Sequence, residues 1–155
     1  MIAHRDDRHP RGVNSEEEMD SQQVRVGVGA VVVQHTQVLL LLRKKPPEAG
    51  FWSLPGGRVE FMELVEDALI RELREELGID VAIEALLCVT NHIVTAENAH
   101  WVSPAYLVRV VSGVPKNLES DKTAAIQWFP LSSLPDNLSV TARSALTAYS
   151  NRGSA

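Results

Sequence analysis

The amino-acid sequence predicts an α+β domain in which layers of helix cover a β-sheet. A helical run with apolar residues four apart, from Val65 to Leu77, stands in the middle of the chain. Segments rich in β-branched and apolar residues lie on both sides of it, and a short helical run, 139–149, follows the last of them. Strands that flank a central helix, with a second helix at the end, are typical of a layered α+β fold.

Composition limits the classes of protein to which the chain can belong. Its 155 residues, 45% of them hydrophobic, are enough for one globular domain with a sizeable core. A net charge of −5 argues against duplex nucleic acid as a main partner, but not against nucleotides, because a bound cation reverses the local field. No apolar run reaches the roughly 20 residues of a membrane span, and the single cysteine, Cys88, suits a reducing compartment. We therefore expect a cytoplasmic protein with no membrane partner.

Two strands are predicted ahead of the central helix. Residues 1–23 are polar and charged, so we expect a disordered or loosely ordered tail, in which Met19 is a second candidate for the translation start. The valine-rich segment 24–33 and the apolar segment 38–42 predict strands joined as an antiparallel hairpin. Arg25, near the start of the first strand, is a candidate contact for a phosphate or a base, with a solvated edge residue as the alternative.

The central helix has a clear end and a weak start. One apolar stripe is formed by residues four apart, namely Val65, Leu69, Leu73 and Leu77. Gly78 stands where a glycine is expected just past a helix C-terminus. A glycine turn at 55–57 precedes the helix, but no Ser, Thr, Asn or Asp stands immediately before Leu64 to cap the first turn.

Three strands and the final helix are predicted after the central helix. Segment 81–94 carries β-branched and apolar residues and is long enough for a bent strand. Segment 100–111 predicts the next strand, and Pro104 within it predicts an edge position or a bulge. Segment 125–129 predicts the last strand, and residues 151–155, beyond the final helix, are expected to be flexible.

Three carboxylates on the central helix are its most informative residues. At roughly 100° per residue, Glu72, Glu75 and Glu76 fall within an arc of about 100° that overlaps the edge of the apolar stripe. Two such charges about 6 Å apart repel by roughly 3 kcal/mol at an effective dielectric near 20, so a cation is expected between them. Oxygen ligands indicate a hard cation, Mg²⁺ first and Mn²⁺ as the alternative. The other interpretation is a solvated acidic face with an ion pair from Arg71 to Glu75.

The spacing of these residues, counted from the glycine turn, matches a known motif. At every defined position the chain resembles the box of the Nudix hydrolases, on Gly57, Glu63, Arg71, Glu72, Leu73, Glu75, Glu76, Gly78 and Ile79. The resemblance implies a Nudix hydrolase domain over residues 24–150, folded as the Nudix-type α/β/α sandwich with a mixed β-sheet. It also implies a hydrolase that uses Mg²⁺.

The resemblance further implies roles for the residues of the box. The implied metal ligands are Glu72, Glu75 and Glu76. Glu72 or Glu75 would also be the catalytic base, since the family varies on this point. Glu63 and Arg71 would form an ion pair that orients Glu72. In the family a glycine often stands just before the glutamate at position 63, and here Met62 stands there instead.

The substrate is expected to be a nucleotide. The candidate substrate-binding residues are Gly56, Gly57, Arg25 and Trp101. A second resemblance, to the MutT-related nucleoside triphosphate diphosphatases, is carried by residues 90–91, 97–98, His100, 115–117 and 128–129. It implies hydrolysis of an NTP or dNTP, modified ones included, to a monophosphate and pyrophosphate. The alternatives are an ADP-ribose or nucleotide-sugar pyrophosphatase and a Nudix module that binds nucleotides without catalysis.

Residues outside the box leave two further questions. Glu97 and Glu119 are candidates for an extra carboxylate at the site, with solvated loop residues as the alternative. Family habit implies a homodimer, which nothing in the residues themselves tests.

Overall fold

The computed structural model describes residues 22–153 of the chain. The expected tail 1–23 therefore lies outside the described residues except for Gln22 and Gln23, and so do the last two residues of the expected flexible segment 151–155. Within the described part, none of the helices combines the length and the apolar character needed to cross a membrane.

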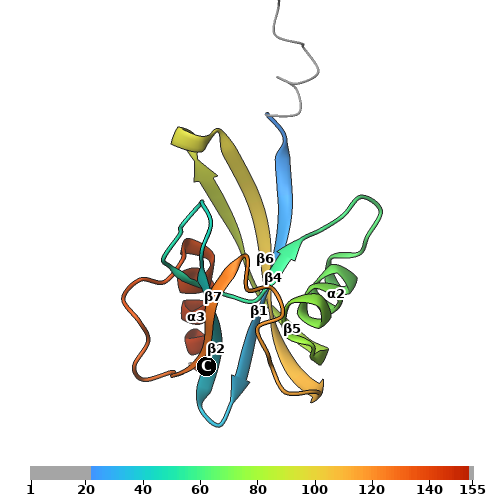
Figure 1. Cartoon of the computed structure of the whole chain (residues 1–155), viewed down its shortest axis with the longest axis vertical. Coiled ribbons are helices and arrows are strands. Elements are labelled where there is room, and N and C mark those ends of the chain that lie inside the picture. Colours follow the sequence, from blue (N-terminus) through green and yellow to red (C-terminus); the bar gives the residue numbers. More distant parts are fainter. Residues whose placement is uncertain (1–21, 154–155) are drawn as a thin grey trace, which may run out of the picture.

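The described chain forms seven strands, two α-helices and one short 3₁₀ helix (Figure 1). The strands are β1 (Val24–Gln34), β2 (Gln37–Arg43), β3 (Trp52–Ser53), β4 (Gly56–Arg58), β5 (Asp80–Val94), β6 (Ala99–Ser112) and β7 (Thr123–Pro130). The helices are α2 (Val65–Leu77), η1 (Thr95–Glu97) and α3 (Val140–Asn151). The main path of the sheet runs β3-β2-β1-β6-β5, with β4 paired to β1 and β7 paired to β2. Because β1 pairs with β6 in parallel and all other pairs are antiparallel, the sheet is mixed as predicted.

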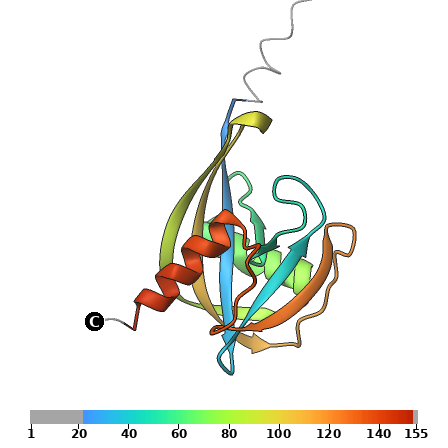
Figure 2. The same ribbon diagram turned by 90° about the vertical axis from the view of Figure 1, so that its left-hand side faces the viewer.

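The two α-helices cover opposite faces of the sheet (Figures 1 and 2). Side chains alternate along a strand, so neighbouring residues of β1 serve different cores. Val28, Ala30 and Val32 pack in the cluster that contains the buried residues of α2, whereas Val31 packs in the cluster that contains those of α3. The predicted α/β/α sandwich is confirmed.

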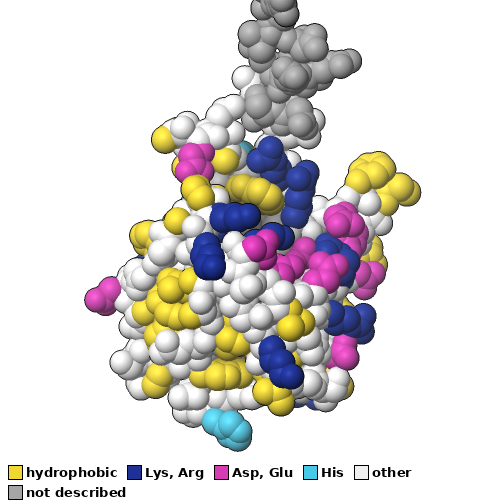
Figure 3. Space-filling view, in the orientation of Figure 1, with side chains coloured by type: hydrophobic (Ala, Val, Ile, Leu, Met, Phe, Trp, Pro, Cys, Tyr) yellow, Lys and Arg dark blue, Asp and Glu magenta, His cyan; other side chains and the backbone are white. Residues whose placement is uncertain are grey.

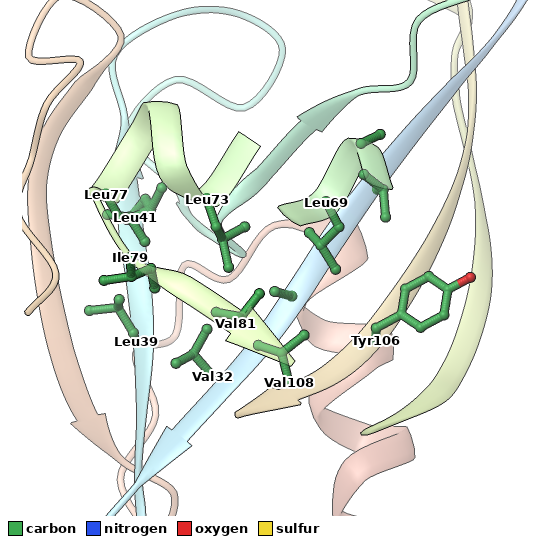
Figure 4. Packing of buried hydrophobic residues seen from close by; sticks show 13 residues of the cluster. Val32, Leu39, Leu41, Leu69, Leu73, Leu77, Ile79, Val81, Tyr106 and Val108 are labelled. Atoms are coloured by element: carbon green, nitrogen blue, oxygen red, sulfur yellow. The ribbon is translucent and has the colours of Figure 1, made fainter. Parts of the chain in front are cut away.

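The core beneath α2 is apolar and closed to solvent (Figure 4). Leu69, Leu73 and Leu77 are fully buried and lie over strands β1, β2 and β6, so the stripe predicted from their spacing is the face that the helix buries. The helix ends at Gly78, which has a φ of 69° and whose N–H donates to the carbonyl oxygen of Arg74. This packing fixes which way the remaining residues of α2 point.

Two local expectations differ from the structure. Pro104 was expected at an edge or at a bulge. Because β6 lies between β1 and β5, the edge alternative is wrong, whereas the register of β5 with β6 does shift beside this segment, between Leu86 and Cys88. The parallel pairing of β1 with β6 is also interrupted between Val102 and Ala105, where Pro104 has no N–H to donate. The glycine turn at 55–57 also contains strand β4, in which Gly56 and Gly57 pair with β1.

Candidate active site

Strand β4 brings the glycine turn against both β1 and α2. Gly56 has a φ of 151°, and any side chain there would collide with the carbonyl oxygen of Val28. A Cβ on Gly57 would occupy the position of the Glu72 carboxylate. Glycine is needed at both positions because the backbone and a charged helix side chain already fill the space. The turn and the helix therefore form one surface, with the backbone of β4 exposed beside the carboxylates of α2.

The carboxylates of α2 line one edge of the helix beside its buried stripe. The Glu72 side chain is only 16% exposed, whereas that of Glu75 is 52% exposed. Glu76 is partly buried, and its Oε1 accepts a hydrogen bond of 3.0 Å from the backbone N–H of Gly56. Figure 3 shows Asp and Glu side chains gathered beside a group of Lys and Arg side chains on this side of the molecule.

A single guanidinium holds several of these carboxylates together. Arg71 donates to both oxygens of Glu63, with Nε 2.7 Å from Oε2 and Nη2 3.0 Å from Oε1. Its Nη1 donates to Glu72 Oε1 at 3.0 Å and to Glu75 Oε2 at 3.2 Å, and its Nη2 donates to the carbonyl oxygen of Arg58. Glu63 is therefore the bidentate partner of Arg71, and Arg71 in turn sets the position of Glu72.

Burial raises the pKa of two carboxylates on α2, those of Glu72 and Glu76. Loss of solvent raises the pKa of Glu76 to about 8, against the opposing effect of its hydrogen bond from Gly56. Burial also raises the pKa of Glu72, although the bonds from Arg71 counteract it. The hydrogen bonds from Arg71 lower the pKa of Glu63, and the same bonds raise the pKa of Arg71. A cation placed beside Glu72 and Glu76 would stabilise the charges of both carboxylates.

The loop between β6 and β7 adds one further carboxylate. It is pinned to the C-terminal end of α2, where the N–H of Leu118 donates to the carbonyl oxygen of Glu76 and that of Lys116 donates to the carbonyl oxygen of Leu77. The charge of Glu119 contributes to the raised pKa of Glu76 and of Glu72, so Glu119 lies near enough to act on both. Glu97 lies in η1 at the tip of the β5–β6 hairpin, far from α2 (Figure 1). Of the two outside candidates, only Glu119 is brought to the site.

The donor set fits a hard divalent cation. All the candidate ligands are carboxylate oxygens, which Mg²⁺ and Mn²⁺ prefer, and the inner two are held in a low-dielectric setting that a cation would relieve. Within residues 22–153, no three acidic, histidine or cysteine side chains already converge as metal ligands. The reason is visible in the contacts, since Arg71 holds Glu72 and Glu75 while Gly56 holds Glu76.

A cleft of about 340 Å³ opens beside the β4 glycines. Its walls come from β1, β4, β5, β6, the loop between β2 and β3, and the start of α3. Its lining includes Gly27, Gly29, Arg43, Pro46, Pro47, Glu48, Gly56, Gly57, Arg58, His92, Trp101, Ser103 and Thr141. This volume is in the range of small-molecule sites, and the lining mixes apolar walls with a few polar groups.

The four candidate substrate-binding residues are placed unequally. Gly56, Gly57 and Trp101 line the cleft. Arg25 is not among its lining residues, because its guanidinium lies over the ring of Trp101, 5.7 Å from the ring centroid. Arg25 therefore contacts a residue that lines the cleft, in a cation–π arrangement, without lining the cleft itself.

Sequence reasoning missed two residues of the cleft, Glu48 and His92. The sequence assigned no role to Glu48, and it predicted only a strand for the segment 81–94 that contains His92. They lie side by side in the wall of the cleft, with Glu48 Oε1 3.7 Å from His92 Nδ1. Nothing in the sequence brings together two residues so far apart along the chain, so only the tertiary fold reveals the pair.

Comparison with known proteins agrees with this geometry. The family model described as NUDIX domain matches residues 23–149. The crystal structure of a MutT NUDIX hydrolase from Burkholderia pseudomallei is 48% identical, with a TM-score of 0.75, over 81% of this chain and 98% of that one. An ADP-ribose pyrophosphatase of Methanocaldococcus jannaschii is 34% identical over 110 residues, which is 71% of this chain and 64% of the relative.

A second curated relative carries a different substrate in its name. An 8-oxo-dGTP diphosphatase of Proteus vulgaris is 40% identical over 75 residues, which is 48% of this chain and 67% of the relative. The chain therefore spans about two thirds of the length of these two curated relatives, 64% and 67%. Their two names differ in substrate, so similarity to them does not choose between the substrates.

Proposed function

The chain belongs to the NUDIX domain family, as a hydrolase of the MutT-related kind, and on this premise we propose that it cleaves a nucleoside triphosphate to the monophosphate and pyrophosphate. One observation carries the proposal. Gly56 and Gly57 line a cleft that is large enough for a nucleoside. The carboxylates of Glu76 and Glu72 lie against these same two glycines, so the candidate reactive groups adjoin a substrate-sized cavity.

The residues of α2 divide the work of binding and catalysis. Glu72, Glu75 and Glu76 would hold the divalent ion, which when bound neutralises phosphate charge and lowers the pKa of coordinated water. Arg71, itself held by Glu63, keeps Glu72 in place beside Gly57. The peptide groups of β4 then lie where the phosphates must pass.

Glu72 and Glu75 are the two candidates for the base that takes a proton from the attacking water. Glu72 is the more buried, and Glu75 is half exposed on the solvent side of the same guanidinium. The carboxylate of Glu72 lies against the backbone of Gly57, which lines the cleft. This position favours Glu72 as the base.

The test is a substrate panel in the presence of Mg²⁺ in which phosphate and pyrophosphate are assayed separately. We expect pyrophosphate from one or a few NTPs or dNTPs. The Glu76→Gln variant should lose most of this activity and also the thermal stabilisation that Mg²⁺ confers on the wild type. Activity near the wild-type level in this variant would remove Glu76 from the ligand set.

An ADP-ribose pyrophosphatase is the second candidate, favoured by the name of the Methanocaldococcus relative. Both reactions use the same carboxylates, so the site does not separate them. Product analysis does, because only the triphosphate reaction releases inorganic pyrophosphate. Turnover confined to ADP-ribose would preserve the metal chemistry and replace the proposed substrate class.

Two properties of the whole protein are also proposed. A homodimer should have about twice the mass of the 17.1 kDa chain in light scattering, and a mass near that of one chain would refute it. A cytoplasmic location is consistent with a single cysteine, Cys88, and fractionation of the source cells tests it.

A further inference from the structure

The cleft contains a carboxylate that the proposed hydrolysis does not use. Glu48 lies on the loop between β2 and β3, and its side chain is only 18% exposed. Its Oε2 accepts a hydrogen bond of 2.9 Å from the backbone N–H of Val140, the first residue of α3. A carboxylate at a helix N-terminus is favoured by the free N–H groups and by the helix dipole. One oxygen of Glu48 is therefore anchored to the scaffold, which fixes the direction of the other.

The second oxygen remains able to accept a hydrogen bond. Glu48 Oε1 lies 3.7 Å from Nδ1 of His92, which is beyond hydrogen-bonding distance. Within residues 22–153 no group donates a hydrogen bond to Oε1. His92 is itself only 14% exposed, so the pair lies in the cleft wall rather than at its mouth. Oε1 is thus a fixed acceptor that lines the cavity.

This acceptor stands at the opposite end of the cleft from the phosphate-binding backbone. Gly57 is on β4 and His92 is on β5, and the pairings run β4 to β1, β1 to β6 and β6 to β5. Three strand spacings of about 4.8 Å separate the two ends by about 14 Å. A nucleotide whose phosphates lie at β4 must therefore direct its base toward β5. The negative charge of Glu48 also excludes the phosphates from that end.

The floor between the two ends suits a flat ring. Trp101 is the cross-strand partner of His92 and lies beside Gly27, where an added Cβ would be 3.6 Å from Trp101 Cε3. Because Gly27 has no side chain, the indole and the bare strand line an open path along the cleft. An aromatic face stacks on any base, so Trp101 supplies affinity without selecting among bases. Selection requires a polar group, and Glu48 provides one.

We propose that Glu48 determines base specificity by selecting bases that carry an amino group over their deaminated, carbonyl-bearing counterparts. This inference rests on the proposed function, because it assumes that a nucleoside triphosphate occupies the cleft. A carboxylate offers only acceptors, so an amino group of the base can donate to Oε1. A carbonyl oxygen in the same place would set two acceptors against each other and leave both without a donor, which a buried site strongly disfavours.

The Glu48→Gln variant tests the proposal because it replaces the acceptor Oε1 with a donor and keeps the hydrogen bond from the N–H of Val140. The amide oxygen of Gln can still accept from the N–H of Val140, while its NH₂ group replaces Oε1 as a donor. The substrates are matched pairs that differ by exchange of an amino group for a carbonyl: dCTP with dUTP, dATP with dITP, and dGTP with dXTP. The measurement is the ratio of kcat/KM within each pair, and a melting curve verifies that the variant is folded.

We expect the wild type to favour the amino member of its preferred pair at least about tenfold, and Glu48→Gln to reduce this ratio by about 10- to 100-fold. Glu84→Gln is the matched control, because Glu84 lies on β5 and pairs with Arg109 without lining the cleft. Its ratios should equal those of the wild type.

Each other outcome overturns a defined statement. Pyrophosphate release with the same ratios in wild type and Glu48→Gln overturns the inference and leaves the proposed function intact. A change confined to the ratio of ribonucleotides to deoxyribonucleotides also overturns it, because Glu48 would then contact the sugar. A wild type that releases pyrophosphate from no triphosphate overturns the proposed function and this inference together.

Discussion

Helices α2 and α3 are similar in length and cover opposite faces of one sheet, but they are built differently. α3 begins with a buried Ser139 whose Oγ accepts a hydrogen bond of 3.2 Å from the N–H of Ala142. α2 begins at Leu64, whose side chain gives no cap, and it carries Glu75 and Glu76 in its last turn, where the helix dipole disfavours negative charge. α3 has no acidic residue at all.

The difference between the two helices lies in their caps and charged residues rather than in their buried faces. The buried side of α2, like that of α3, is an ordinary apolar face that holds the helix on the sheet. Only the exposed edge of α2 departs from what stability alone would favour. Such local departures are expected where a protein holds reactive groups in place. Changes to the carboxylate edge of α2 should therefore lower activity without lowering stability. Changes to the buried face of α3 should lower stability without lowering the activity of the folded protein.

The largest effect is expected at Glu72. Glu72→Gln should lower kcat by about 10²- to 10⁴-fold, because it removes a proposed metal ligand and the proposed base while keeping the shape of the side chain. Its melting temperature in the absence of metal should not fall, since a poorly solvated charge is lost. Glu66→Gln is the control on the same helix, because Glu66 accepts from the hydroxyl of Tyr106 and a Gln can do the same. Equal activity in the two variants would contradict the comparison.

Truncation of the buried faces should produce the next largest effect. Leu73→Ala on α2 and Leu146→Ala on α3 should each lower the free energy of unfolding by about 2–5 kcal/mol, because both side chains are buried. Only Leu73→Ala should also lower kcat in the fraction that remains folded, since Leu73 adjoins Glu72. Urea unfolding and rates at low temperature measure the two quantities. Loss of kcat in Leu146→Ala would show that the two helices are not separable.

Substitutions at the N-caps of the two helices should change the free energy of unfolding by smaller amounts and in opposite directions. Ser139→Ala should destabilise the protein by about 1 kcal/mol, because the N–H of Ala142 loses its partner. Leu64→Ser should stabilise it by about 0.5–1 kcal/mol, since Leu64 already has the extended conformation of a cap and is 67% exposed. Thermal unfolding measures both. An unchanged melting temperature in Leu64→Ser would mean that a side-chain cap at this position adds no stability to α2.

The same comparison explains what could be predicted from the sequence. The buried face of α2 followed from the four-residue period of its leucines, and its C-terminal end followed from Gly78, because both signals are local. The two-residue hairpin turn was harder. His35 and Thr36 both have positive φ, at 50° and 63°, without the Asn-Gly pair that usually marks such a turn. The pairing of β1 with β2 nevertheless follows from their valine- and leucine-rich composition.

The site could be predicted only in part, for physical reasons. Glu72, Glu75 and Glu76 lie on one helix, so their spacing alone places them together. Glu48 and Glu119 lie on loops, and their positions depend on hydrogen bonds to the ends of α3 and α2 that no local pattern encodes. Gly56 and Gly57 were expected as a turn, and the bonds that make them a strand come from β1. The positions of these residues thus depend on long-range contacts, which the periodicity of the sequence does not reveal.

The smallest predicted effect concerns the C-terminal end of α2. Arg74 in its last turn pairs with Asp80 of β5, whereas α3 has no basic residue in its last turn. The hydrogen bonds from Arg74 and Ser112 lower the pKa of Asp80 below its ordinary value of 3.8. Since the unfolded chain binds the proton more readily, this stabilisation is present above pH 3.8 and is lost as the pH falls through the lowered folded value. Asp80→Asn should therefore melt slightly below the wild type at neutral pH and approach it in acid. The expected difference in melting temperature is small, because both side chains are largely solvated and an exposed ion pair contributes little. A difference in melting temperature that persists at the lowest pH would indicate that Asp80 stabilises the protein through packing rather than through its charge.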